Sequence, residues 1–351
     1  IIYGNDEKGN YIKKAVAYTI EEHNINIKAL DSNACHIVQR LQSRGYKAYI
    51  VGGAVRDLIL ERKPKDFDIA TSATPTKIRS IFKNSRVIGK RFRLVHIYVG
   101  DHIYEVSTFR SIEDGSVGNK YGQIEEDVQR RDFSCNALYY DPSHELLIDY
   151  GGGFIDIKKK CLRPVISRKT IFLEDPVRLI RAIKYSCAIG AKLPLLLKMQ
   201  IKKDAHLLEN TSPSRLTEEI NKIFHSIHVY DIVTLLFAYG LYAYIQPNAC
   251  VFLYESKGFR SVYFSSLKEL NDEILKGTIK KQSDFLPFLI RDYIFLISNI
   301  EHKSKKELYT FVYKETRHFI LPMNPQRKEL ENAVKMCLKN LEKMEAKQNE
   351  D

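Results

Sequence analysis

The stretch that decides the fold runs from Val51-Gly-Gly-Ala-Val-Arg-Asp-Leu58 to Lys65-Asp-Phe-Asp-Ile-Ala-Thr71. An apolar run over residues 48–51 predicts a strand, the glycine pair predicts a turn, and residues 54–60 predict a helix. Glycines between a strand and a helix let backbone N–H groups come close to a phosphate at the start of the helix. The first part of the stretch therefore favours phosphate binding.

The second part carries two carboxylates, Asp66 and Asp68, on a strand predicted over residues 66–70. Side chains alternate along a strand, so two residues that are two positions apart face the same side. Such a pair suits Mg²⁺, which takes oxygen ligands and usually a substrate phosphate as well. Together the two parts predict a nucleotide held by its triphosphate, with two metal ions at the α-phosphorus.

Neither part is specific by itself, because an isolated Asp-x-Asp is usually two solvated carboxylates and Gly-Gly is usually a turn. The ordered set, with Arg56 and Asp57 in the helix and Lys65 before the acidic pair, resembles the signature of the class II nucleotidyltransferases. These are the bacterial poly(A) polymerases and the tRNA CCA-adding enzymes. The resemblance covers roughly residues 32–224 and implies template-independent nucleotide addition to RNA 3′ ends, with Mg²⁺ as cofactor and ATP as substrate.

The family pattern also implies a third carboxylate, and Glu105 is the candidate. The turn at Gly100-Asp101 predicts a hairpin that brings the strand of Glu105 into the same sheet. An exposed strand position explains a charged residue there equally well. In the implied two-metal mechanism, one ion activates the RNA 3′-hydroxyl and the other stabilises the pyrophosphate that leaves.

A second motif, Arg130-Arg-Asp-Phe-Ser-Cys-Asn-Ala137, resembles the family's ribose-selecting sequence, normally Arg-Arg-Asp-Phe-Thr-x-Asn. Ser134 keeps the hydroxyl of the usual threonine. Arginine, aspartate and asparagine can bind phosphate and ribose hydroxyls, although a surface loop leading into a strand is the simpler explanation of the bare sequence. The nucleotide-binding residues that we expect in this half of the chain are Gly52, Gly53, Arg56, Arg131, Asp132 and Asn136.

The segment from Leu173 to Lys184 predicts a helix with Asp175 at its N-cap and Pro176 at its first position. The cap alone explains Asp175. The resemblance adds that Asp175 and Arg178 form an edge that reads the incoming base, and that Arg181 contacts base or phosphate. Adenine and cytosine both offer the matching donor–acceptor pair, so this edge leaves the choice between them open.

Two further motifs favour structural roles. The segment from Asp149 to Asp156 contains three glycines and resembles the family's hinge between head and neck, although a plain turn fits nearly as well. Arg215 and Glu219, in the motif that resembles the family's neck-fixing sequence, are spaced as an i,i+4 pair on a helix.

The branch of the family depends on residues 87–96, which resemble the segment that marks bacterial poly(A) polymerases. Lys90, Arg91 and Arg93 would contact RNA phosphates there, or would form a solvated basic turn. We predict polyadenylation from ATP; the alternative is a tRNA CCA- or A-adding enzyme, because a mark outside the base pocket can be inherited without its specificity. An inactive RNA-binding module would fit the loss of a metal carboxylate, but Asp66 and Asp68 are both present.

The composition supports an RNA partner, either mRNA or tRNA. The 351 residues include 55 Lys and Arg against 43 Asp and Glu, a net charge of +12, which favours a polyanion; a genome rich in A and T explains the lysines equally well. The six cysteines are scattered without Cys-x-x-Cys spacing, which indicates a reducing, cytoplasmic compartment. Apolar stretches are too short to cross a membrane. The composition does not indicate an oligomeric state.

We expect an α+β protein, in which a small head with a short mixed or antiparallel sheet precedes all-α domains. The expected parts are an N-terminal extension (1–30), a catalytic head (31–160), a helical neck for base recognition (161–228), a helical body for RNA binding (229–325) and a charged C-terminal helix (326–351). Strands are predicted over 48–51, 66–70, 94–99 and 102–109, and helices over 32–44, 72–83, 176–189, 193–208 and 214–224. Residues 110–129 are polar and predict a mobile loop.

Overall fold

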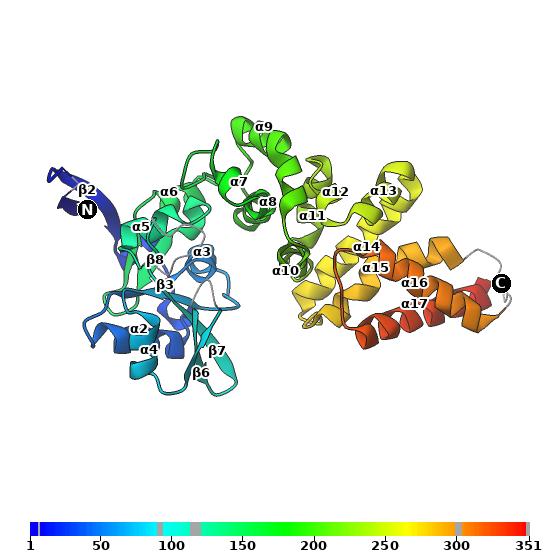
Figure 1. The fold of residues 1–351 in the computed structure, drawn as a ribbon, viewed down its shortest axis with the longest axis horizontal. Coiled ribbons are helices and arrows are strands. Elements are labelled where there is room, and N and C mark those ends of the chain that lie inside the picture. The colour runs from blue at the N-terminus through cyan, green and yellow to red at the C-terminus, as the bar shows by residue number, and fades with distance from the viewer. Residues whose placement is uncertain (6–7, 90–93, 113–120, 299–303, 349–351) are drawn as a thin grey trace. The chain divides into compact units, whose positions relative to one another are not determined.

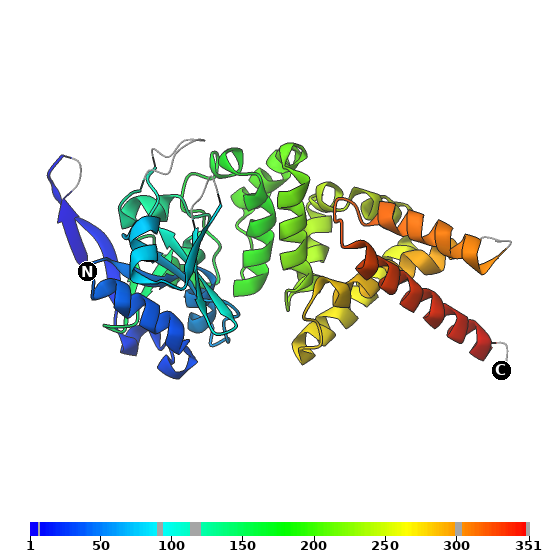
Figure 2. The same ribbon diagram turned by 60° about the horizontal axis from the view of Figure 1, so that its bottom comes forward.

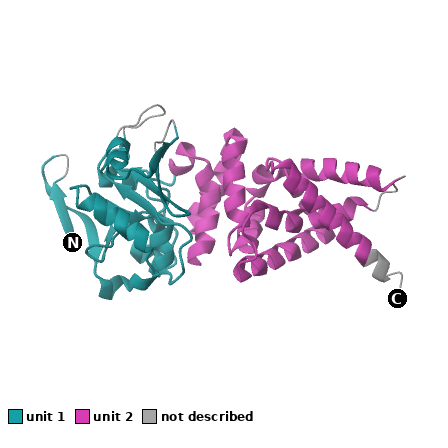
Figure 3. Ribbon diagram, turned by 90° about the horizontal axis from the view of Figure 1, so that it is seen from below, with its two compact units in different colours: residues 1–168 teal, residues 169–351 magenta. Residues whose placement is uncertain are grey.

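The computed structural model describes residues 1–5, 8–89, 94–112, 121–298 and 304–348 (Figure 1). The chain forms two compact units (Figure 3). Unit 1 comprises residues 1–168 and carries both strands and helices, and unit 2 comprises residues 169–351 and is helical throughout its described part. The prediction of an α+β head followed by helical domains is confirmed. No helix in the described ranges is both long and apolar enough to cross a bilayer.

Unit 1 is built on one mixed sheet. Its described strands are β1 (Ile2–Asn5), β2 (Tyr11–Tyr18), β3 (Ala48–Val51), β4 (Asp68–Thr71), β5 (Ser85–Ile88), β6 (Leu94–Val99), β7 (His102–Thr108), β8 (Leu138–Asp141) and β9 (Leu146–Asp149). Its described helices are α1 (Ile20–His23), α2 (Ser32–Gln42), α3 (Gly53–Ile59), α4 (Pro75–Ile81), α5 (Ile124–Gln129) and α6 (Gly153–Lys158), with short 3₁₀ turns η1 (Ile27–Ala29) and η2 (Ser134–Asn136).

The described strands follow the order β1-β2-β9-β8-β3-β4-β7-β6-β5 across the sheet. Among them, β4 and β7 pair in parallel and the other neighbours pair antiparallel. The strands β3 and β4, which were predicted on either side of the glycine pair, lie at the centre. The hairpin β6–β7 turns at Gly100-Asp101 and brings β7 next to β4, as its turn signal predicted.

One face of the sheet is covered by α2, which packs against β3 and β4. The helix begins at Ser32 because Asp31 caps it, accepting the backbone N–H of Ala34 at 2.9 Å. Its buried residues recur at helical spacing and are Ala34, Ile37, Val38 and Leu41. Fully burying a side chain such as Leu41 contributes about 1.5–3 kcal/mol.

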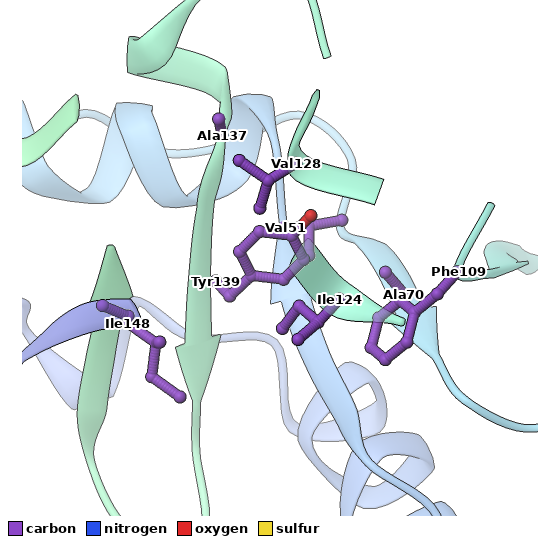
Figure 4. Close-up of a cluster of buried hydrophobic side chains, with 9 residues drawn as sticks. Val51, Ala70, Phe109, Ile124, Val128, Ala137, Tyr139 and Ile148 are labelled. Atoms are coloured by element: carbon purple, nitrogen blue, oxygen red, sulfur yellow. The ribbon is translucent and has the colours of Figure 1, made fainter. Parts of the chain in front are cut away.

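The opposite face carries a second cluster of buried side chains, shown in Figure 4. Val51, Ala70 and Tyr139 come from the central strands, and Ile124 and Val128 come from α5. The two residues of α5 are four positions apart and therefore lie on one side of that helix. Asp68 belongs to this second face, because it lies two residues before Ala70 on β4.

The first 30 residues are not a separate extension, contrary to the sequence-based expectation. Val16, Ala17 and Tyr18 of β2 pair with β9, and Ala15 belongs to the buried cluster. The hydrophobic alternation of β2 is weak because only its last three residues, Val16 to Tyr18, pair with β9. Residues 1–30 therefore belong to unit 1.

The expected mobile loop over residues 110–129 is partly helical. Residues 113–120 lie outside the described part of the chain, whereas α5 occupies Ile124–Gln129. Gln123 and Glu126 form a capping box, and Glu126 Oε2 accepts the backbone N–H of Gln123 at 2.8 Å. The polar composition that predicted a loop reflects this acidic first turn, which is favourable at the N-terminus of a helix.

Unit 2 consists of helices. Those in its described residues are α7 (Ile171–Glu174), α8 (Val177–Ile189), α9 (Leu195–Asp204), α10 (Pro213–Phe224), α11 (Val229–Ala238), α12 (Tyr242–Ile245), α13 (Pro247–Glu255), α14 (Lys257–Lys276), α15 (Gln282–Ser298), α16 (Lys305–Phe319) and α17 (Arg327–Gln348), with the 3₁₀ turn η3 (Ala205–Asn210). Helix α8 packs on α10 and α11, α11 on α14, and α15 on both α14 and α17. The helices predicted over 176–189 and 214–224 match α8 and α10 to within one residue.

The three glycines after β9 are held by one carboxylate. Asp149 accepts the backbone N–H groups of Gly151, Gly152, Gly153 and Phe154 at 2.7–3.0 Å, and it is buried. A Cβ on Gly153 would lie 2.0 Å from the backbone oxygen of Ser134, so a larger residue does not fit. The segment that resembled a hinge is therefore a tightly bonded start of α6 in this structure.

We predict that Asp149→Ala lowers the free energy of unfolding of unit 1 by at least about 3 kcal/mol, because hydrogen bonds to a charged group each contribute about 1.5–3 kcal/mol. Thermal and denaturant unfolding followed by circular dichroism would measure the change. Asp101→Ala, which removes an exposed carboxylate from a turn, is the matched control. An Asp149→Ala protein as stable as this control would contradict the assignment.

Candidate functional site

The site in unit 1 starts where β3 ends and β4 begins. Val51, the last residue of β3, is paired with Asp68, the first residue of β4. Gly52 follows with φ of 71°, a conformation that glycine adopts without strain. A Cβ on Gly52 would lie 4.0 Å from Asp68 Oδ2 and 3.8 Å from Arg131 Nη1. The turn therefore brings the backbone beside a carboxylate and a guanidinium, and residues from three separate motifs meet there.

Glu105 occupies the strand position that matches Asp68. Ile69 pairs with Val106 in the parallel ladder of β4 and β7, so Asp68 and Glu105 each lie one step earlier on neighbouring strands. Matching positions face the same side of a sheet, and the strands are about 4.8 Å apart. The Glu105 side chain is 51% exposed, and its Oε1 lies 3.4 Å from His96 Nε2 on β6. The register thus places both carboxylates on one face.

Asp66 lies just before the sheet rather than in it. The predicted strand began at residue 66, but β4 begins at Asp68, so strand alternation does not determine where the exposed Asp66 points. Within the described ranges, no three Asp, Glu, His or Cys side chains lie close enough together to hold a metal ion. Two exposed carboxylates on one face, Asp68 and Glu105, nevertheless suit Mg²⁺, which is commonly held by one or two carboxylates together with substrate phosphates.

Arg131 is fixed by several partners. Its Nε and Nη2 donate to Asp127 Oδ2 at 3.3 and 3.1 Å, its Nε donates to the Tyr139 hydroxyl at 3.0 Å, and its Nη1 donates to the Asn136 carbonyl at 3.1 Å. The guanidinium carbon also lies 4.9 Å from the centre of the Tyr139 ring. Burial opposes the charge, but Tyr139 and Asp127 outweigh it and raise the pKa of Arg131. The group is a permanent cation with a fixed direction.

The other predicted nucleotide-binding residues form one hydrogen-bonded chain. Arg56 Nη1 on α3 donates to Asn136 Oδ1 at 2.8 Å, and Asn136 Nδ2 donates to Asp132 Oδ1 at 3.3 Å. Arg56 also forms an ion pair with Asp57 at 2.8 Å. The structure thus brings together Gly52, Gly53, Arg56, Asp68, Arg131, Asp132 and Asn136, most of the residues predicted for this half of the chain. Sequence analysis missed Asp127 and Tyr139, because neither lies in a recognised motif.

In unit 2, Asp175 is held by Arg215, which the spacing along the sequence had paired with Glu219. Arg215 Nη2 lies 2.9 Å from both oxygens of Asp175, and the backbone N–H of Val177 donates to Oδ1 at 3.2 Å. The helix begins one residue later than predicted, at Val177. Asp175 therefore combines a contact at the helix start with an ion pair to α10, and its partner is 40 residues away in the sequence.

The predicted pair between Arg215 and Glu219 is wrong. Glu219 is buried and instead accepts from Arg181 Nε at 3.0 Å and Lys184 Nζ at 2.6 Å. Both cations lie on α8, so this ion-paired group joins α8 to α10. Helical spacing alone allows a pair between Arg215 and Glu219. A buried carboxylate is tolerated when it is paired with positive charge, and Arg181 and Lys184 supply that charge to Glu219.

Arg178, the other expected base-reading residue, is buried. Its Nη1 donates to Glu174 Oε2 at 3.0 Å and lies 3.4 Å from the Ile171 carbonyl. These contacts hold the guanidinium beside the start of α8. Lys90, Arg91 and Arg93, which were predicted to contact RNA, lie outside the described residues.

Unit 1 also contains a cavity of about 650 Å³ beside the loop that leads to β4. Residues 24, 26, 28–31, 58, 61–64 and 67 line it, so Phe67 borders it but neither Asp66 nor Asp68 does. None of the carboxylates and arginines that were predicted for catalysis or nucleotide binding lines this cavity.

Comparison with known proteins identifies two families that match parts of this chain. The Poly A polymerase head domain family matches residues 48–163, and the family described as the probable RNA and SrmB-binding site of polymerase A matches residues 197–253. Poly(A) polymerase I of Escherichia coli O6:H1 is 36% identical over 274 residues, which are 74% of this chain and 58% of that protein. The CCA-adding enzyme of Geobacillus thermodenitrificans is 36% identical over 222 residues, 62% of this chain and 55% of that protein.

Among solved structures, the CCA-adding enzyme of Bacillus stearothermophilus in complex with CTP matches with a TM-score of 0.59 and 25% identity, covering 88% of this chain and 82% of that one. The chain belongs to the class II nucleotidyltransferase family, with the bacterial poly(A) polymerases and the CCA-adding enzymes. It spans less than three fifths of the length of the curated relatives named above.

The buried ion-paired group in unit 2 generates a prediction about pH. Burial alone would raise the pKa of Glu219, but Lys184 and Arg181 outweigh it and hold that pKa below its ordinary value of 4.5. The stabilisation is therefore complete above pH 4.5 and is lost as the pH falls through the lowered pKa. We predict that Glu219→Gln lowers the free energy of unfolding at neutral pH by about 3–5 kcal/mol, because it removes the buried negative charge that both cations contact.

Melting temperatures measured from pH 3 to pH 7 would test this prediction. The difference between wild type and Glu219→Gln should be largest near neutral pH and should shrink in acid. Glu218→Gln, at the neighbouring exposed position that pairs with Lys222, is the control and should change little. A pH-independent difference would show that Glu219 does not stabilise unit 2 through its charge.

Proposed function

We propose that this chain adds AMP from ATP to RNA 3′ ends without a template and releases pyrophosphate. The observation that carries the proposal is the meeting of Gly52, Asp68 and Arg131, which come from three motifs far apart in the sequence. A backbone turn, a carboxylate and a fixed cation are the groups that phosphoryl transfer requires, since its catalysis consists mainly of positioning and charge stabilisation.

Asp66, Asp68 and Glu105 would hold Mg²⁺ together with the triphosphate. All three carboxylates are exposed, and the register places Asp68 and Glu105 on one face of the sheet, which supports this role. When bound, Mg²⁺ activates the 3′-hydroxyl and neutralises charge on the leaving pyrophosphate. Asp68 supplies a ligand from a rigid strand, whereas Asp66 supplies one from the loop before it.

The nucleotide itself would be held by the hydrogen-bonded group around Arg131. Gly52 and Gly53 have no side chain, so phosphate oxygens can approach the backbone closely. Arg56 and Arg131 supply positive charge, and Asp132 with Asn136 can accept from and donate to the ribose hydroxyls. Because Asp127 and Tyr139 already fix Arg131, little ordering is needed when the nucleotide arrives.

The base would be read by Asp175 and Arg178 of unit 2, with Arg181 beside them. Arg215 occupies part of the Asp175 carboxylate, but two oxygens provide about four acceptor positions, and some remain for a base amino group. Arg215 therefore acts as a positioning residue, which fixes the direction of the carboxylate.

The favoured branch is polyadenylation in the cytoplasm, with mRNA or tRNA as the acceptor. It is supported by the resemblance of residues 87–96 and by the longer match to the poly(A) polymerase than to the CCA-adding enzyme named above. All six cysteines are free, which suits a reducing compartment. The second candidate is CCA or A addition to tRNA, which the matched CCA-adding structure supports and which the base-reading edge allows.

We predict that Asp68→Asn lowers nucleotide addition by at least about a hundredfold without unfolding the protein, because it removes a charge from the site while preserving its shape. Asp66→Ala should have a comparable effect. Single-turnover extension of a labelled RNA with ATP and Mg²⁺ would measure both. Asp101→Asn removes a charge from the same sheet at the β6–β7 turn and should retain full activity. Activity of Asp68→Asn within a few-fold of wild type would exclude it as a metal ligand.

We also predict that ATP is added repeatedly to an unstructured RNA and that CTP is added poorly. A base whose edge does not match the fixed groups leaves them unpaired, at about 1–3 kcal/mol each, which gives roughly tenfold or greater discrimination. Extension should be measured with each triphosphate on that RNA and on a tRNA lacking its terminal CCA. Efficient addition of CTP to the tRNA, followed by a single ATP, would establish the CCA-adding alternative.

A further inference from the structure

The N-terminal hairpin contains a surface that the proposed chemistry does not use. Strand β2 pairs with β9 only through Val16–Tyr18, so within the described residues the outer part of β2 is paired with β1 alone. Figure 2 shows the hairpin standing out from the rest of unit 1 near the N-terminus. It forms one end of the described strand order.

Two tyrosines lie against each other on this hairpin. The ring centres of Tyr3 and Tyr11 are 5.2 Å apart, with 14° between the ring planes. Nevertheless Tyr3 is 49% exposed and Tyr11 is 74% exposed. The pair stabilises the hairpin, yet much of its aromatic surface remains in water. Exposed aromatic surface of this kind is what unpaired bases stack on, at about 1–3 kcal/mol per base.

A lysine accompanies the tyrosines on the same face. Tyr3 is directly opposite Lys13 in the register of β1 and β2, so their side chains share a side. Lys14, the next residue, points to the opposite face, where its Cγ lies 3.2 Å from the position of a Cβ on Gly4. Lys13 can therefore reach a phosphate beside a base stacked on Tyr3 or Tyr11, whereas Lys14 cannot.

The strand register relates this face to the proposed catalytic site. Ile2 of β1 is opposite Ala15 and packs against the buried cluster that contains Tyr139 and Val51. Val51 is opposite Asp68. Tyr3 follows Ile2 on β1 and therefore faces the other side of the sheet, so an RNA that contacts both Tyr3 and the region of Asp68 passes the outer edge of the sheet. The sheet separates β2 from β4 by four strand spacings, about 19 Å.

We propose that Tyr3, Tyr11 and Lys13 form a stacking site for single-stranded RNA, upstream of the 3′ end that reacts near Asp68. The proposal rests on the proposed function for the identity of the RNA end. The chain's net charge of +12 favours an RNA partner. A second copy of the chain is a poorer partner for this edge: β1 is four residues long and irregular between Ile2 and Tyr3, and short, bulged strands flanked by lysine oppose edge pairing.

Equilibrium binding of a fluorescent oligoadenylate of about 20 nucleotides, without Mg²⁺ or ATP, tests the site directly. Tyr3→Ala/Tyr11→Ala should weaken binding at least about fivefold, as loss of base stacking predicts. Tyr3→Phe/Tyr11→Phe keeps the rings and should bind within about twofold of wild type. Lys13→Ala should weaken binding and reduce its salt dependence, whereas Lys14→Ala is the matched control and should not.

Primer length separates this site from the catalytic one. A primer of three nucleotides spans about 10 Å when stacked and cannot reach the hairpin from Asp68. The alanine double variant should therefore extend it at the wild-type rate but should show a raised KM for the longer RNA. Failure of the wild type to extend either primer would refute the proposed function, while the binding measurement would still decide on the hairpin.

Unchanged oligoadenylate binding by a double alanine variant with a wild-type melting temperature would overturn the proposal. If that variant is unstable, the comparison of Lys13→Ala with Lys14→Ala decides, and equal affinities would overturn it. Sedimentation completes the test: if the tyrosine substitutions alter self-association but leave RNA affinity unchanged, the hairpin binds a second copy of the chain and the RNA site is refuted.

Discussion

The pairing of Val51 with Asp68 at the ends of two central strands is the constraint on which unit 1 depends. It ends β3 where the chain must turn, and only a residue such as Gly52, with its positive φ, makes that turn without strain. The same pairing fixes Asp68 at the start of β4, and the parallel ladder to β7 then places Glu105 beside it. A one-residue slip would turn Asp68 toward α2 and bury a charge.

The arginines around this turn are held by acceptors that the motifs do not include. Arg131 is partly buried, and a buried guanidinium is tolerated only when it is paired. Asp127 supplies the negative charge that pairs with Arg131. Tyr139, on the strand next to β3, supplies a hydroxyl that accepts from Arg131 and a ring that the guanidinium lies against. Since Tyr139 also belongs to the buried cluster, the packing of the sheet and the direction of the cation depend on the same side chain.

The sequence predicted the central strands, the order of motifs and most of the residues that meet near Asp68. Local signals sufficed there, since each motif carries its own alternation and turn residues. The exceptions have a common physical reason. Strands β1 and β2 show little alternation of apolar and polar residues, because β2 pairs with β9 over a few residues only. The sequence of α5 is too short and too acidic to be distinguished from that of a loop. The partner of Asp175 could not be predicted either, because spacing along one helix suggests Glu219 for Arg215, whereas tertiary packing decides.

The two groups of charged residues differ in how much freedom they keep. Groups that must hold a direction are bonded within the protein: Arg56 by Asp57 and Asn136, Arg131 by Asp127, and Asp175 by Arg215. Glu105 is half exposed, and its contact with His96 is long, at 3.4 Å. Replacing the long contact between Glu105 and the His96 imidazole by a contact to a metal ion would cost little free energy. Reorienting Arg131, in contrast, would break several hydrogen bonds at once. The protein thus fixes the groups that would orient a nucleotide in advance and leaves Glu105 open to ligand.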